Sequence, residues 1–141
     1  MKYIILEDIR SAYNVGAIFR TADASGVAKI FLTGYTPAPI DRFGRTQPEI
    51  QKTSLSASAT MPWEKVKSMS ELIARLKAEG VTVAAVELSS ASVPLKEFTE
   101  PEHVAYIVGN EVDGVAKETL ELVDVIVELP MLGQKESLMF R

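Results

Sequence analysis

Five short segments of the chain are almost continuously apolar. They are KYIIL (residues 2–6), AKIFLT (28–33), VTVAAVEL (81–88), VAYIVG (104–109) and DVIVELP (124–130). A strand with one face in water alternates between apolar and polar residues, whereas a strand covered on both faces is apolar throughout. The five segments therefore predict a parallel sheet that is covered on both faces.

The segments between these predicted strands carry helical patterns. Residues 11–26 and 63–80 each place apolar side chains near one stripe, and each ends on a glycine, the residue type that commonly follows a helix. A third, shorter helix is predicted in residues 113–124, with Asp113 or Gly114 at its start. Strands that alternate with helices predict an α/β fold.

One stretch lacks a regular pattern. Residues 36–62 contain four prolines and little periodicity, which is typical of a functional loop inside a compact domain. The sequence contains no internal repeat and no low-complexity tract, and 141 residues are enough to bury one core. We therefore expect a single domain over residues 1–141.

Polar residues follow the predicted strands. They are Gly34 and the segments 87–90, 109–114 and 130–137. Ligands of open parallel sheets bind in the crevice outside the carboxyl ends of the strands. This pattern predicts a small-molecule site at that edge, although the pattern alone does not define the ligand class.

Composition excludes several kinds of site. The chain has no cysteine and a single histidine, which excludes disulfides, thiolate metal sites and histidine-rich ligand sets, and an all-carboxylate magnesium site has no motif. We therefore expect no metal. The apolar run near Met1 is too short for a signal peptide or a membrane span, so a cytoplasmic protein without membrane contact is expected.

Charge is distributed unevenly along the chain. The net charge is -4, yet residues 10–52 carry six basic groups against three acidic ones. A basic first third is compatible with local phosphate contacts. For Arg42 and Arg45, a solvated loop is an equally good explanation.

Four segments of the chain, taken in order, resemble the motifs of a known protein family. They are NVGAIFRTADASGV (residues 14–27), KTSLSAS with MPWE (52–58 and 61–64), VAYIVGNEVDGVAKETLELVD (104–124) and IVELPMLGQKESL (126–138). Taken alone, each has an ordinary structural explanation, such as a helix start, a strand-to-helix turn or a solvated loop. Together, from Leu6 to Leu138, they resemble the SpoU/TrmH family of RNA ribose 2′-O-methyltransferases in the SPOUT superfamily.

The resemblance implies an α/β-knot (SPOUT) fold, in which the C-terminal part of a parallel sheet is tied into a trefoil knot. True knots are too rare for any periodicity to predict one. It also implies S-adenosylmethionine as the cofactor, RNA (tRNA or rRNA) as the substrate and a homodimer. A separate RNA-binding domain is not expected in residues 1–141.

The resemblance also assigns roles to residues of this sequence. It implies that Asn14, Arg20, Glu111 and Ser137 form the catalytic site, with Arg20 engaging the substrate phosphate and 2′-hydroxyl and Glu111 supporting that arginine. The implied cofactor-binding residues are Glu87, Leu88, Gly109, Asn110, Gly114, Leu129, Met131, Ser137 and Leu138. The candidate RNA-binding residues are Arg10, Arg42, Arg45 and Lys52.

The chemistry of methyl transfer fits these residue types. The methyl group of a sulfonium is already activated, so the protein mainly aligns donor and acceptor and helps the ribose hydroxyl to lose its proton, without need of a metal. A guanidinium is a poor base. We therefore expect Arg20 to orient and polarise the hydroxyl, with direct proton abstraction as the alternative if a substrate phosphate and Glu111 shift its balance.

The sequence departs from the family pattern at its end. Met139 stands where the family motif has Asn, and the chain ends at Arg141, before the last helix of the family. We therefore expect an incomplete knot. Two hypotheses stay open: an RNA 2′-O-methyltransferase or a C-terminally shortened relative, and a non-catalytic truncated or engineered scaffold that binds RNA or has a structural role. Another nucleotide-binding α/β protein is disfavoured, because no glycine-rich phosphate loop follows the first strand.

Overall fold

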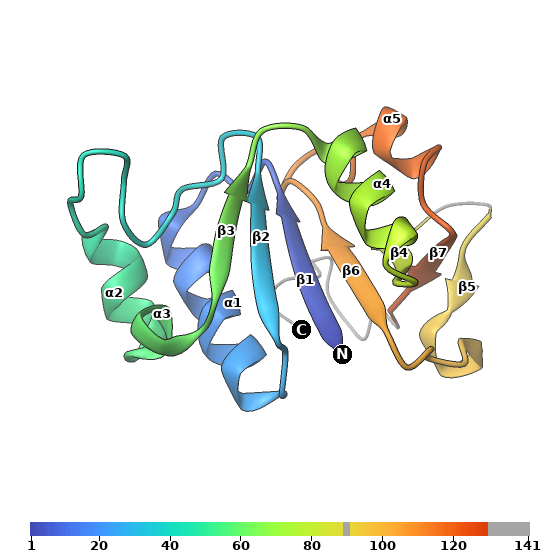
Figure 1. Cartoon of the computed structure of the whole chain (residues 1–141), viewed down its shortest axis with the longest axis horizontal. Coiled ribbons are helices and arrows are strands. Elements are labelled where there is room, and N and C mark those ends of the chain that lie inside the picture. Colours follow the sequence, from blue (N-terminus) through green and yellow to red (C-terminus); the bar gives the residue numbers. More distant parts are fainter. Residues whose placement is uncertain (89–90, 130–141) are drawn as a thin grey trace.

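The strands of the protein form one parallel sheet. The computed structural model describes residues 1–88 and 91–129, and within them seven strands are arranged in the order β3-β2-β1-β6-β4-β7-β5, with every pairing parallel (Figure 1). The strands are β1 (Lys2–Glu7), β2 (Lys29–Thr33), β3 (Trp63–Val66), β4 (Thr82–Val86), β5 (Val93–Pro94), β6 (Val104–Val108) and β7 (Val125–Glu128). The predicted parallel sheet is confirmed.

Helices cover both faces of this sheet. They are α1 (Ala12–Ala24), α2 (Pro48–Ser54), α3 (Ala57–Thr60), α4 (Met69–Ala78), α5 (Lys117–Leu120) and the 3₁₀ helix η1 (Leu95–Glu97). In residues 1–88 and 91–129, no helix is long and apolar enough to cross a membrane.

The alternation of side chains along each strand divides the core into two layers. Ile5 and Leu6 are neighbours in β1 and both are fully buried, yet Ile5 packs in the cluster with the α4 residues Leu72 and Leu76. Leu6 packs in the cluster with Phe19 of α1. Because successive side chains of a strand point to opposite faces, α4 covers one face of the sheet and α1 the other (Figure 1).

The five predicted strands are present, but one predicted helix starts too early. Residues 63–66 form β3, in which Trp63 pairs with Ile30 of β2. Helix α4 begins only at Met69, because the Ser68 hydroxyl accepts a hydrogen bond from the N–H of Glu71 at 3.2 Å and caps the helix there. The two-residue strand β5 was not predicted.

Two other expectations were wrong in their boundaries. The stretch 36–62 is not wholly irregular, since it contains α2 and α3. Helix α2 begins with Pro48, a residue that favours the first turn of a helix. Helix α5 begins at Lys117 and not at Asp113 or Gly114, because the residues before it form a closed loop that is described below.

Helices α1 and α2 are in close contact at Gly16. A Cβ atom at this position would lie 1.8 Å from Thr53 Oγ1 and 2.8 Å from the carbonyl oxygen of Ile50. The Thr53 hydroxyl also donates a hydrogen bond to the carbonyl oxygen of Tyr13 at 3.0 Å. This packing leaves no room for a side chain, so the two helices hold each other in a fixed position.

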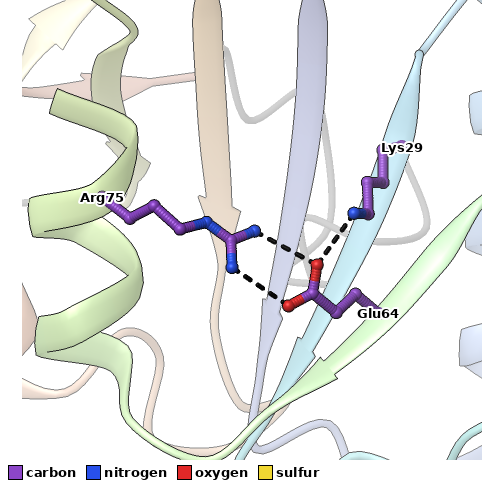
Figure 2. Close-up of polar contacts among 3 residues, drawn as sticks. All are labelled: Lys29, Glu64 and Arg75. Atoms are coloured by element: carbon purple, nitrogen blue, oxygen red, sulfur yellow. Dashed lines mark hydrogen bonds and ion pairs between the residues drawn. The ribbon is translucent and has the colours of Figure 1, made fainter. Parts of the chain in front are cut away.

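An ion-pair network joins β2, β3 and α4 (Figure 2). The Glu64 carboxylate accepts hydrogen bonds from Lys29 Nζ at 2.8 Å and from the two terminal nitrogens of Arg75 at 3.0 and 3.1 Å. The Phe31 ring lies beneath both cations, with Lys29 Nζ 5.0 Å and Arg75 Cζ 5.3 Å from its centroid. The hydrogen bonds from Arg75 and then from Lys29 lower the pKa of Glu64 from 4.5 to about 2.

We predict that this network makes folding stability depend on acidity. Because the pKa of Glu64 is lowered in the folded state, its stabilisation is fully present above pH 4.5 and is lost as the pH falls towards about 2. Glu64→Gln should lower the free energy of unfolding by about 1 kcal/mol at neutral pH, since the pair is partly exposed and screened. It should also flatten the acid limb of the stability profile in urea denaturation.

The matched control is Glu97→Gln, which removes an exposed carboxylate from η1. It should leave the acid limb unchanged. An acid limb of equal slope in the wild type and Glu64→Gln would contradict the prediction.

Candidate functional site

A pocket of about 900 Å³ lies along the sheet between α1 and the loops that follow β4, β6 and β7. Its walls include the strand residues Val86, Val108 and Val127. The sequence-predicted residues that line it are Glu87, Gly109, Asn110, Glu111, Gly114 and Leu129. The structure therefore brings residues 109–114 of the VAYIVGNEVDGVAKETLELVD motif together with the ends of two other strands, as the position of polar residues after strands predicted.

Residues 109–114 form a closed loop. Asn110 and Gly114 pair with each other through backbone hydrogen bonds of 3.1 and 2.9 Å. A Cβ atom on Gly109 would lie 2.4 Å from the carbonyl carbon of Gly114 and from the nitrogen of Val115. Gly114 has a φ of +74°, and a Cβ there would lie 2.1 Å from the Glu87 carboxylate. Both glycines are thus required by the fold of the loop.

The Asn110 side chain holds this loop against the ends of β1 and β2. Its Nδ2 donates to the carbonyl oxygen of Asp8 at 2.8 Å and to the Tyr35 hydroxyl oxygen at 2.7 Å. Its Oδ1 accepts from the N–H groups of Val112 and Asp113 at 2.8 and 2.9 Å. All donor and acceptor sites of this buried amide are used within the protein. Its side chain therefore shapes the pocket wall.

The Glu111 carboxylate binds the backbone that leads into α1, whose N-cap is the Ser11 hydroxyl. It accepts hydrogen bonds from the N–H groups of Arg10 and Ser11 at 3.1 and 3.0 Å and lies 3.4 Å from Asn14 Nδ2. Partial burial raises the pKa of Glu111, but these hydrogen bonds outweigh it and hold the pKa below its ordinary value. Since its partners are the two residues before α1 and the Asn14 side chain in the first turn, Glu111 ties the start of α1 to the loop of residues 109–114.

The expected contact between Glu111 and Arg20 is not found within residues 1–88 and 91–129. Arg20 is exposed on α1, and no hydrogen bond or ion pair within residues 1–88 and 91–129 joins it to a carboxylate. It lies six positions after Asn14, which is about 9 Å further along the helix and about 240° around its axis. Glu111, which contacts Asn14, therefore lies on a different side of α1 from Arg20.

Among the described residues, Asn14, Arg20, Leu88 and the four candidate RNA-binding residues do not line the pocket. Leu88 is 66% exposed. The four candidate RNA-binding residues are all exposed: Arg10 before α1, Arg42 and Arg45 in the loop between β2 and α2, and Lys52 on α2. Met131, Ser137 and Leu138, and also Met139, lie outside the described residues, so their predicted roles stay predictions.

Sequence reasoning missed one buried carboxylate beside the site. Glu7, at the end of β1, is 6% exposed and accepts hydrogen bonds from the N–H of Ala116 at 2.8 Å and from the Thr119 hydroxyl. It ties β1 to the start of α5. The signal was present, because a carboxylate directly after an apolar strand that is covered on both faces must have buried partners.

Fold and pocket together define an α/β protein with a pocket that lies along one face of a parallel sheet and reaches the carboxyl ends of β4, β6 and β7. A family model described as the SpoU rRNA Methylase family matches residues 1–138. The chain belongs to this family, and the resemblance inferred from the motifs is confirmed. The trefoil knot stays a prediction.

Relatives of known name resemble almost the whole chain. The 23S rRNA (guanosine-2'-O-)-methyltransferase RlmB of Neisseria meningitidis is 32% identical over 135 residues, which are 96% of this chain and 51% of that protein. The tRNA (guanosine(18)-2'-O)-methyltransferase of Escherichia coli is 30% identical over 139 residues, 96% of this chain and 56% of that protein. The chain thus spans about half the length of the curated relatives it matches.

A solved structure has the same fold. It is the AdoMet-bound rRNA methyltransferase from Sinorhizobium meliloti, which superposes with a TM-score of 0.84 at 28% sequence identity. The match covers 97% of this chain and 50% of that one. The α/β fold predicted from the sequence is therefore confirmed, and the chain shares it with the Sinorhizobium meliloti enzyme.

We predict that Gly109→Ala destabilises the protein by about 1–3 kcal/mol, because the added Cβ must displace the backbone of residues 114 and 115. Asp113→Ala, an exposed change in the same loop, should cost less than about 0.5 kcal/mol. Chemical denaturation of both variants measures the difference. Equal stability of Gly109→Ala and the wild type would show that the loop is not tightly closed.

Proposed function

We propose that this chain is the methyl-transfer domain of an S-adenosylmethionine-dependent RNA ribose 2′-O-methyltransferase that acts on tRNA or rRNA. The observation that carries the proposal is the pocket itself: in a chain that matches the SpoU family over residues 1–138, residues 109–114 of the VAYIVGNEVDGVAKETLELVD motif form part of its wall. Relatives named as rRNA and tRNA 2′-O-methyltransferases support the substrate class.

The residues of the pocket fit the proposed cofactor. Its volume of about 900 Å³ lies in the range of small-molecule sites, and its walls combine apolar strand residues with a few polar groups. Glu87, Asn110 and Glu111 are each engaged in internal hydrogen bonds, so the wall is rigid before a ligand binds. When bound, S-adenosylmethionine supplies an activated methyl group. The homologous structure with AdoMet supports this assignment.

On the RNA side, we propose that Arg20 clamps a substrate phosphate and polarises the ribose hydroxyl. Its guanidinium presents several donors in a planar fork that matches a phosphate. Within residues 1–88 and 91–129, no carboxylate neutralises it, so its charge is directed to solvent. Glu111 contributes differently, because it positions α1, on which Arg20 lies, against the pocket wall.

Titration with S-adenosylmethionine tests the cofactor assignment. We expect saturable heat in isothermal calorimetry with the wild type and with Asp23→Ala, an exposed change that does not line the pocket. We expect weaker binding with Gly114→Ala, whose Cβ would push into the Glu87 carboxylate. If the folded wild type gives no binding heat at millimolar S-adenosylmethionine, the enzyme proposal is wrong and the non-catalytic scaffold is favoured.

Arg20→Ala tests the role of the guanidinium. We expect a loss of methyl transfer of roughly 100-fold or more with RNA transcripts and labelled cofactor. The melting temperature should stay nearly unchanged, since exposed changes alter stability by less than about 0.5 kcal/mol. Asp23→Ala, an exposed change on the same helix, is the control and should retain activity. A large drop in melting temperature for Arg20→Ala would instead indicate a structural role.

The predicted homodimer and the cytoplasmic location belong to the same proposal. The homodimer follows from the family resemblance, and the location from the short apolar run near Met1. Sedimentation of the purified chain tests the first, and fractionation of cells tests the second.

A further inference from the structure

The turn formed by residues 41–45 presents an aromatic ring together with two cations. Phe43 is 67% exposed. The guanidinium carbons of Arg42 and Arg45 lie 4.9 and 5.0 Å from the centroid of its ring. An aromatic ring that lies in water beside two guanidinium groups adds nothing to the core, because Phe43 belongs to neither buried cluster.

The 41–45 turn is ordered by its own hydrogen bonds. The Asp41 carboxylate accepts from the N–H groups of Phe43 and Arg45 at 2.8 and 2.9 Å, and from Arg45 Nε at 2.9 Å. Gly44, with a φ of +79°, donates its N–H to the Asp41 carbonyl oxygen at 2.9 Å. The ring is therefore held at the tip before any ligand binds, which lowers the entropy cost of binding.

The two arginines are not equivalent. Arg45 forms an ion pair with Asp41 at 2.9 Å, so its charge is partly neutralised. Arg42 forms no ion pair within residues 1–88 and 91–129, and its charge remains available to a partner. A phosphate is a suitable partner for such a guanidinium.

The turn precedes helix α2, which packs on the proposed catalytic helix α1. It lies in the loop between β2 and α2, which is on the edge of the sheet where the carboxyl ends of β1, β2 and β3 lie (Figure 1). Helix α2 is fixed on α1 by the contact of Gly16 with Thr53. An RNA strand bound by the turn would therefore be held at a set position relative to Arg20.

We propose that the 41–45 turn binds an unpaired nucleotide of the RNA, with the Phe43 ring stacked on the base and Arg42 on an adjoining phosphate. Aromatic rings stack on bases only where the base face is open, as in loops and single strands. The turn would thus direct the enzyme to unpaired segments. This inference rests on the proposed function for its substrate class.

Fluorescence anisotropy with a labelled RNA hairpin that has an unpaired loop tests the inference. We expect Phe43→Ala to weaken binding roughly 5- to 100-fold, the effect of losing one stacked base. Phe43→Tyr should bind like the wild type, whereas Phe43→Leu, which is apolar but not aromatic, should bind like Phe43→Ala. Binding of a blunt RNA duplex should be equal in all four proteins.

The charge contribution is measured by the salt dependence of the same binding. Arg42→Gln should reduce the magnitude of the slope of log affinity against log salt by about 1, the change expected for the loss of one phosphate contact. Lys96→Gln, which removes an exposed charge from η1, is the control and should leave the slope unchanged.

The inference is overturned if the wild type does not bind the hairpin, if Phe43→Leu binds it like the wild type, or if Phe43→Ala loses duplex binding equally. These results are separable from the proposed function. Hairpin binding that depends on Phe43 without cofactor binding or methyl transfer would refute only the enzyme. Methyl transfer that is unaffected by Phe43→Ala would refute only the turn.

Discussion

The pocket wall depends on the hydrogen bonds of a single buried amide. Asn110 connects the backbone after β1, the Tyr35 hydroxyl after β2 and the N–H groups of its own loop. An unpaired buried polar group is costly, so the loop cannot open without breaking all of these bonds together. With the loop closed, Glu111 reaches the start of α1. One strand-to-helix turn thereby fixes both the pocket and the helix beside it.

Close packing also joins α1 to α2, the helix that follows the 41–45 turn. Gly16 allows α2 to approach so closely that Thr53 hydrogen-bonds to the backbone of α1. The 41–45 turn precedes α2 and is closed by Asp41. The proposed cofactor site, the proposed phosphate clamp and the proposed base-binding turn are therefore parts of one connected body, whose relative positions do not need to be set by the RNA.

The sequence predicted features that extend over many residues and missed those that depend on single contacts. Long apolar runs located the sheet, whereas β5, with two residues, is too short to form a pattern. The helix predicted from Trp63 ignored the Ser68 and Glu71 capping signal. The pairing of Arg20 with Glu111 was inferred from family roles, and helical geometry separates them: the carboxylate serves the first turn of α1, while Arg20 lies beyond the second.

The separation of Arg20 from Glu111 favours a role for Arg20 in orienting the substrate over direct abstraction of the proton. A guanidinium gives up its proton only where its charged form is strongly disfavoured. Arg20 is exposed, and the role that we propose for it is to donate hydrogen bonds to the substrate. The proton of the ribose hydroxyl would then have to pass to an acceptor other than Arg20. Arg20 would act by holding that phosphate in place and not by abstracting the proton itself.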